Sequence, residues 1–266
     1  MPHHNRSIDR MSYDYSQTYR TSKEAIEFYR YRASPFHQAV LDQEVWAILN
    51  VDERTGEKFF NSNHILEVGI GGGAISSKLE MKIQNSNLVG VDVSRNMLEV
   101  CKTIFSRSFQ MGNTNLMVGD IFHLPFRSSS LDSVLTVRLV PNLVQNDLAL
   151  REVARILRPG GQVIFDIYNR MSFLSLLDSV ISLSLRRKKK PYKHTCDLNH
   201  VVKICESAGL PVRAHVECLF LAEALFKFVP RQLLRTAMFV DKIVSNMPLF
   251  SKISTRVFII SNKKSE

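Results

Sequence analysis

The sequence has no apolar run that approaches the roughly 20 residues of a membrane-spanning helix. Its first residues, MPHHNRSIDRMSYDYS, are too polar for a secretory signal peptide. It has only four cysteines, and their spacing matches neither a disulfide framework nor a metal site. No internal repeat is present. We therefore expect a cytoplasmic protein with reduced thiols and no bound metal.

Acidic side chains become scarce towards the C-terminus. Residues 1–170 hold 19 Lys and Arg against 18 Asp and Glu, whereas residues 171–266 hold 16 against 7. Almost all of the net charge of +10 therefore belongs to the last third, which predicts an acidic surface or substrate near it.

The basic run RRKKK (186–190) follows an apolar stretch, FLSLLDSVISLSL (173–185). Three interpretations stay open: a solvated loop, a peripheral membrane contact through 173–194, and nucleic-acid binding. The third lacks a recognisable RNA-binding module, so we expect no nucleic-acid partner.

Apolar runs alternate with helical periodicity from residue 64 onward. The predicted strands are 64–70, 87–93, 114–120, 131–140 and 162–168, and the predicted helices between them are 74–83, 95–107 and 146–157. This alternation predicts a parallel sheet with helices on both faces. Upstream, 22–50 predicts two helices divided at Pro35. Downstream we expect helices at 198–210 and 222–246, and strands at 212–221 and 256–264.

A glycine-rich turn joins the first of these strands to its helix. The stretch HILEVGIGGGAISSKL places Glu67 two residues before glycines at 69, 71, 72 and 73. Glycine lets a ligand approach the backbone closely, so the turn predicts a binding site. The spacing G-x-G-x-x-A from Gly69 satisfies the loose fingerprint of a nicotinamide dinucleotide site, with Asp92 for the ribose. Against that interpretation, the Glu67 carboxylate would repel a pyrophosphate and favour a positively charged ligand.

Three further segments follow the turn: GVDVSRNML (90–98), GDIFHLPFRSSSLDSV (119–134) and ALREVARILRPGGQVIF (149–165). Together with LEVGIGGG, they resemble in order and spacing the motifs of class I S-adenosylmethionine-dependent methyltransferases. The resemblance covers about Ile65 to Tyr168. It is greatest to the small-molecule branch that includes ubiquinone and menaquinone biosynthesis methyltransferases. S-adenosylmethionine has no phosphates, so Glu67 would favour this cofactor.

The resemblance implies roles for the residues that match the motifs. Glu67 would lie near the methionyl ammonium, and Asp92 would accept hydrogen bonds from both ribose hydroxyls. Asp120 would accept one from the adenine amine. The other implied cofactor-binding residues are Gly69, Gly71, Gly73, Val93, Met97, Ile121 and Arg138. The family pattern does not dictate an arginine at position 138.

Candidates for contact with the methyl acceptor lie in the N-terminal helices and after the fourth strand. Tyr19 resembles the family's N-terminal tyrosines that close over the cofactor; simple aromatic packing is the alternative. His37, on helices that cap the cofactor in this family, is a candidate base, whereas packing is favoured for His123. Asn142 would face the substrate or cap a helix. No residue stands out as catalytic, because displacement at a sulfonium carbon depends mainly on positioning.

The family implies an α/β, Rossmann-like sheet of seven mostly parallel strands with helices on both faces. Its last two strands would form a C-terminal hairpin with the final strand antiparallel. We divide the chain into an N-terminal helical arm and cap (1–50) and a methyltransferase domain (51–266) with a helical, basic insertion at about 170–195.

The predicted function is methyl transfer from S-adenosylmethionine to a small, lipophilic acceptor. Two alternatives stay open. One is an RNA or protein methyltransferase that uses the basic C-terminal third, and the other is a non-catalytic S-adenosylmethionine-binding module. The stretch VRLVPNL after the fourth predicted strand lacks the Asn-Pro-Pro-Tyr signature of base-amine methylation.

Overall fold

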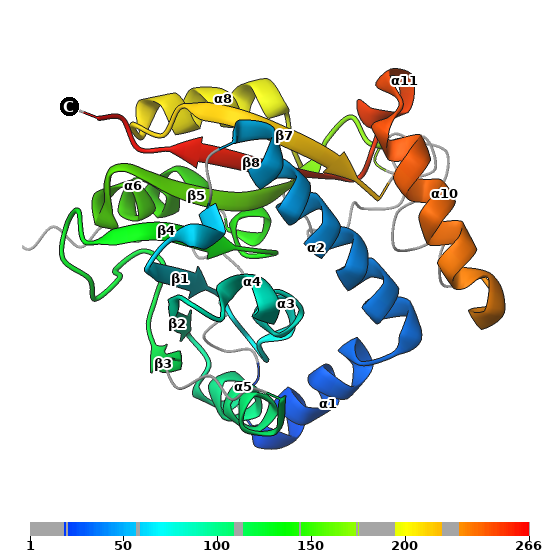
Figure 1. Cartoon of the computed structure of the whole chain (residues 1–266), viewed down its shortest axis with the longest axis horizontal. Helices are drawn as coiled ribbons and strands as arrows, with labels where there is room; N and C mark the ends of the chain where they lie inside the picture. The colour runs from blue at the N-terminus through cyan, green and yellow to red at the C-terminus, as the bar shows by residue number, and fades with distance from the viewer. Residues whose placement is uncertain are drawn as a thin grey trace, which may run out of the picture.

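In the computed structural model the strands form one sheet, in the order β3-β2-β1-β4-β5-β8-β7 (Figure 1). The structure describes residues 19, 21–56, 59–108, 114–143, 145–173, 175, 195–219 and 229–265. The strands are β1 (His64–Val68), β2 (Asn87–Asp92), β3 (Thr114–Val118), β4 (Leu131–Thr136), β5 (Leu157–Asn169), β6 (Thr195–Cys196), β7 (Val212–Cys218) and β8 (Arg256–Asn262). Only β8 runs antiparallel to its neighbours, β5 and β7, among the described strands. The mostly parallel sheet with an antiparallel last strand is therefore confirmed.

The sheet is covered on both faces because its strands present apolar residues to both sides. On one side Ile65 and Ile164 join a core with α2 (Pro35–Thr55), α3 (Ala74–Lys78), α4 (Glu80–Ile83), α5 (Arg95–Ser108) and α10 (Leu234–Asn246). On the other side Leu66 and Val163 join a core with α6 (Asn146–Ile156) and α8 (Leu198–Ser207). Successive strand residues thus enter opposite cores, as the two-residue period of a strand requires.

Two helices precede the sheet, as the sequence predicts. α1 (Ser22–Arg32) starts with a capping box between Thr21 and Glu24, and α2 starts with Pro35 at its first position. Figure 1 shows α2 crossing the face of the sheet from α1 towards β7. The predicted division at Pro35 is confirmed.

Several boundaries differ from the sequence-based expectation. The helix expected at 74–83 breaks at Leu79 into α3 and α4. β4 ends at Thr136 because Arg138 has a left-handed φ of +62° that no strand accommodates. β5 begins at Leu157, five residues earlier than expected, and the two-residue β6 beside its end was not expected.

The C-terminal strands pair as a hairpin would, but a long connection joins them. β7 and β8 are antiparallel, and η4 (Arg231–Leu233), α10 and α11 (Pro248–Ser251) lie between them. Residues 222–228 of the helix expected at 222–246 lie outside the described residues, as do residues 174 and 176–194 of the predicted basic insertion. Within the described part of the chain, every helix is too short or too polar to cross a bilayer.

Candidate cofactor and acceptor site

The site lies where β1, β2, β3 and β4 end. These four strands are parallel, so their carboxyl ends meet at one edge of the sheet. The strand order reverses between β1 and β4, because the chain builds outward from β1 on both sides. In open α/β sheets such a switch point leaves a crevice outside the strand ends where ligands bind.

The glycine loop between β1 and α3 has one packed side and one open side. Gly69, Gly71 and Gly73 have φ values of +76°, +53° and +75°, a region that favours glycine. A Cβ at Gly73 would lie 2.6 Å from Phe105 Cε1, so this glycine permits close packing on α5. A Cβ at Gly71 would meet only Met97 Cε, at 3.5 Å, among the described residues. Gly71 therefore marks the side of the loop that a ligand can approach.

Glu67 is a buried carboxylate beneath this loop. Its side chain accepts a hydrogen bond from the Ser76 hydroxyl on α3, and the residue is only 2% exposed. Burial raises the pKa of Glu67 to about 7; the Ser76 hydrogen bond opposes that shift and the nearby charge of Asp92 adds to it. A cationic ligand beside Glu67 would favour its ionised form.

Asp92 ends β2 and holds the loop from the other side. Its Oδ2 accepts a hydrogen bond from the Gly71 amide at 2.9 Å, and its Oδ1 accepts one from the Ser94 amide at 2.8 Å. Burial raises the pKa of Asp92, and the backbone hydrogen bonds lower it. A carboxylate accepts about four hydrogen bonds in all, so Asp92 retains capacity for a ribose diol.

These two carboxylates fit S-adenosylmethionine better than a dinucleotide. The buried Glu67 carboxylate and the half-buried Asp92 carboxylate flank the loop. Their negative charge attracts an ammonium group and repels a pyrophosphate, and their oxygens can accept hydrogen bonds from a ribose. The open side of Gly71 provides the close backbone approach that either ligand needs. Charge therefore decides between the two interpretations, in favour of a cationic ligand.

Comparison with known proteins identifies the same region. Residues 66–165 match the model of a family described as a methyltransferase domain. A demethylmenaquinone methyltransferase of Leptospira interrogans is 35% identical over 105 residues, which are 38% of this chain and 41% of that protein. The ubiquinone/menaquinone biosynthesis C-methyltransferase UbiE of Geotalea daltonii is 30% identical over 108 residues, 40% of this chain and 46% of the relative. Residues 66–165 therefore match a methyltransferase domain in sequence.

A solved structure extends the likeness of fold to nearly the whole chain. The magnesium protoporphyrin IX methyltransferase of Synechocystis PCC 6803, crystallised with bound S-adenosylhomocysteine, superposes with a TM-score of 0.64 at 12% identity, over 92% of this chain and 97% of that chain. The curated relatives are matched over less than half of their own lengths.

Asp120 follows β3 at the same edge of the sheet, where the carboxyl ends of the parallel strands meet. Its Oδ1 accepts a hydrogen bond from the Phe122 amide at 3.0 Å, and the residue is exposed. Ile121 beside it is buried, and His123 is exposed. The Gly119 amide donates to the Asp92 carbonyl at 3.1 Å, which holds the ends of β2 and β3 together. Val93 is 38% exposed and Met97 is buried.

Tyr19 lies over the turn after β2. Tyr19 packs its ring on Phe28 with centroids 4.8 Å apart, and its carbonyl accepts a hydrogen bond from the Asn96 side chain at 2.9 Å. Tyr29 on α1 approaches the glycine loop: a Cβ at Gly72 would lie 3.3 Å from its Cδ2. Sequence analysis missed Tyr29; the only signal was its place on a helix expected to cover the site.

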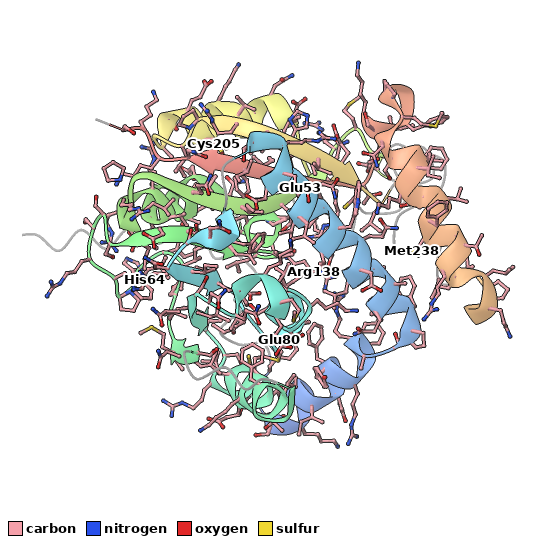
Figure 2. All side chains as sticks on the ribbon, in the orientation of Figure 1. Glu53, His64, Glu80, Arg138, Cys205 and Met238 are labelled. Carbon is pink, nitrogen blue, oxygen red and sulfur yellow. The ribbon has the colours of Figure 1, made fainter. Side chains whose placement is uncertain are left out.

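Arg138 lies in a ring of ion pairs that sequence analysis also missed (Figure 2 labels Arg138, next to α2). Its guanidinium donates two hydrogen bonds to Glu44 of α2, with Nε 2.7 Å from Oε1. Its backbone amide donates to Asp166 Oδ1 of β5 at 2.6 Å. Arg256 of β8 completes the ring, because it donates to both Glu44 and Asp166. Glu44, Asp166 and Arg256 have no exposed surface.

The side chains of His37 and Asn142 each make a hydrogen bond within the protein. His37 is 4% exposed; its Nδ1 lies 2.8 Å from Ser34 Oγ and its ring packs on Tyr31. Asn142 ends η3 (Val140–Asn142), and its side-chain amide donates to the Arg138 carbonyl. The described residues contain no cluster of three His, Cys, Asp or Glu side chains that could hold a metal ion.

Proposed function

We propose that this protein transfers a methyl group from S-adenosylmethionine to a small-molecule acceptor. One observation carries the proposal: the buried Glu67 carboxylate and the half-buried Asp92 carboxylate flank a glycine loop whose Gly71 side is open. That arrangement suits a ligand with a cationic amino-acid end and a ribose.

Each cofactor-facing residue then has a distinct role. Glu67 binds the ammonium, Asp92 binds the ribose hydroxyls and Asp120 accepts from the adenine amine. Val93, Met97 and Ile121 supply apolar contact for the adenine, and the backbone at Gly69, Gly71 and Gly73 admits the ligand. Arg138 lies at the methionyl end, with its guanidinium held by Glu44.

The chain's contribution to the reaction is positioning. When bound, the cofactor supplies a methyl group on a sulfonium, which is already a good electrophile. The residues around it need to hold acceptor and cofactor in line and exclude water, which can lower a barrier by about 7–11 kcal/mol. A base is required only where the acceptor must lose a proton. Tyr19, His37 and Asn142 are the candidates for acceptor contact.

The acceptor we propose is lipophilic, such as a quinone precursor. Two relatives are named for quinone biosynthesis, and the stretch 173–185 is more apolar than a free surface helix. The five cations at 186–190 next to it would attract anionic lipid, each by about 1 kcal/mol near the surface. Helices from 22–50 and 170–195 would then cover the acceptor.

Calorimetry with S-adenosylhomocysteine and NAD tests the cofactor half. We expect binding of S-adenosylhomocysteine in the micromolar range and none of NAD. NAD binding would contradict the proposal. A methyl-transfer assay with radiolabelled S-adenosylmethionine and cell extract separates an enzyme from a binding module, and a labelled RNA or protein product would favour the alternative substrate classes.

Vesicle co-sedimentation tests the membrane half. The wild type should pellet with anionic vesicles at low salt, whereas a variant with Gln at the five basic positions 186–190 should not. A matched control removes the same charge from exposed sites elsewhere: Lys23, Lys102, Arg127, Arg235 and Lys264. The control should still pellet. If both variants behave like the wild type, the basic run is a solvated loop.

A further inference from the structure

The Arg256 guanidinium is buried in a way that stability alone does not explain. Arg256 has the largest fully buried side chain among the described residues, and its Nε lacks a hydrogen-bond partner there. Replacing a buried ion pair by apolar residues of similar volume is often neutral or stabilising. An unpaired buried donor adds a further cost. The ring of Glu44, Arg138, Asp166 and Arg256 therefore calls for a role beyond holding the core together.

The ring supports the backbone conformation of Arg138 in the loop after β4. Arg138 has φ = +62°, where the Cβ of an L-residue crowds the backbone, so this conformation needs support from its surroundings. Asp166 accepts the Arg138 amide on one side, and Asn142 donates to the Arg138 carbonyl on the other. Arg256 in turn holds the second oxygen of Asp166.

Leu139, the residue after Arg138, connects the loop after β4 to the cofactor loop by a packing contact. Leu139 packs on Gly69, since a Cβ at Gly69 would lie 3.0 Å from Leu139 Cδ2. The Gly69 amide donates to the Val91 carbonyl at 2.7 Å, so Gly69 sits between Leu139 and the end of β2. A change at Arg138 therefore displaces the side chain that contacts the first glycine of the loop.

We propose that Arg256 and Asp166 are positioning residues for the cofactor: their ion pairs hold Arg138 in its left-handed conformation, and Arg138 holds Leu139 against Gly69. Neither residue has exposed surface, so neither touches the ligand. Glu44 closes the same ring from α2, which links the helix over the site to the cofactor loop. The inference rests on the proposed cofactor role of that loop.

A double-mutant cycle with S-adenosylhomocysteine affinity as the readout tests this. Arg256→Met should weaken binding at least about tenfold, Leu139→Ala should weaken it by a similar factor, and the double variant should be little worse than either. Arg256→Lys, which keeps a cation, should recover part of the affinity. Independent, multiplicative losses would overturn the proposal, because Arg256 would not act through Leu139.

Val257→Ala is the matched control. Val257 is the next residue of β8 and is 2% exposed. It packs in the core on the α6 and α8 side of the sheet, and it lies outside the ring. It should lower the urea midpoint while leaving the affinity of the folded protein unchanged. An equal loss of affinity in the control would reduce the Arg256 effect to general destabilisation and overturn the proposal.

Two further outcomes are distinguishable. If Arg256→Met does not fold, the double-mutant cycle is measured with Asp166→Asn in its place, together with Leu139→Ala. Asp166→Asn keeps the shape of the side chain and weakens its pairing with Arg256. If the wild type itself does not bind S-adenosylhomocysteine, the proposed function fails. If the wild type binds it and folded Arg256→Met binds it equally well, only the positioning role fails.

Discussion

Alanine at two neighbouring glycines should separate packing from ligand binding. In Gly73→Ala the new methyl group would lie 2.6 Å from Phe105 Cε1 and 2.8 Å from Cys101 Sγ, at φ +75°. A left-handed L-residue costs about 1–2 kcal/mol, and overpacking a core costs about 1–3 kcal/mol more. We therefore expect Gly73→Ala to lose about 2–5 kcal/mol of unfolding free energy, a large part of the stability of a typical domain.

Gly71→Ala meets only the first of these costs. Its φ is +53°, and its methyl group would reach no closer than 3.5 Å to Met97 Cε. The expected loss is about 1–2 kcal/mol, or a fall in Tm of roughly 2–8 °C for a chain of this size. Its methyl group points to the open side of the loop, so the affinity for S-adenosylhomocysteine should fall by about tenfold or more, equivalent to about 1.4 kcal/mol.

Urea unfolding and calorimetry of both variants measure the two effects separately. Gly73→Ala should have the lower midpoint, and Gly71→Ala should have the greater loss of affinity relative to its loss of stability. If Gly71→Ala binds S-adenosylhomocysteine as tightly as the wild type, the open side of the loop is not the ligand side. If Gly73→Ala is as stable as the wild type, α5 does not pack as described.

Four other measurements test the site and the core. The pKa of Glu67 is about 7 in the folded protein and 4.5 ordinarily. Its contribution to the free energy of unfolding is therefore greatest below pH 4.5 and is lost as the pH rises through 7, by up to about 3 kcal/mol. Urea unfolding at several pH values should show that the free energy of unfolding depends less on pH in Glu67→Gln. S-adenosylhomocysteine binding at pH 7 should release about half a proton from Glu67, measured by calorimetry in two buffers and absent in Glu67→Gln. Asp92→Asn keeps the shape of the side chain but loses charge-assisted hydrogen bonds of about 1.5–3 kcal/mol, so affinity should fall at least about tenfold with a folded protein by circular dichroism. All four cysteines are buried, and burial raises the pKa of Cys101 and Cys205, so a thiol reagent should titrate four groups only after unfolding; rapid native reaction would contradict that burial.

The sheet and the cofactor loop could be predicted because their signals are local. A strand, a glycine turn and a helix occupy consecutive residues around Gly69, and each further strand is a short apolar run. β6 was missed because two residues carry no periodicity. The left-handed φ of Arg138 was missed as well, because nothing in VRLVPNL distinguishes it from the end of a strand.

The ring of ion pairs could not be predicted because it depends on topology. Arg256 is 212 residues from Glu44 and 90 from Asp166 along the chain. In the sequence Arg256 is one charge before the apolar run VFII, where an exposed strand end is the ordinary expectation. Only the insertion of β8 between β5 and β7 brings it under α2.

That late insertion has a consequence for synthesis on the ribosome. β1 to β5 and the glycine loop emerge in order and pair with neighbours already made, but Arg256 follows Arg138 by 118 residues. At about 5–20 residues per second, roughly 6–24 s pass between the two. During that interval Arg256 is not available to pair with Glu44 and Asp166, so the loop after β4 lacks this part of its support until β8 has been made. The residue that completes the ring of ion pairs is therefore made long after the residues proposed to contact the cofactor.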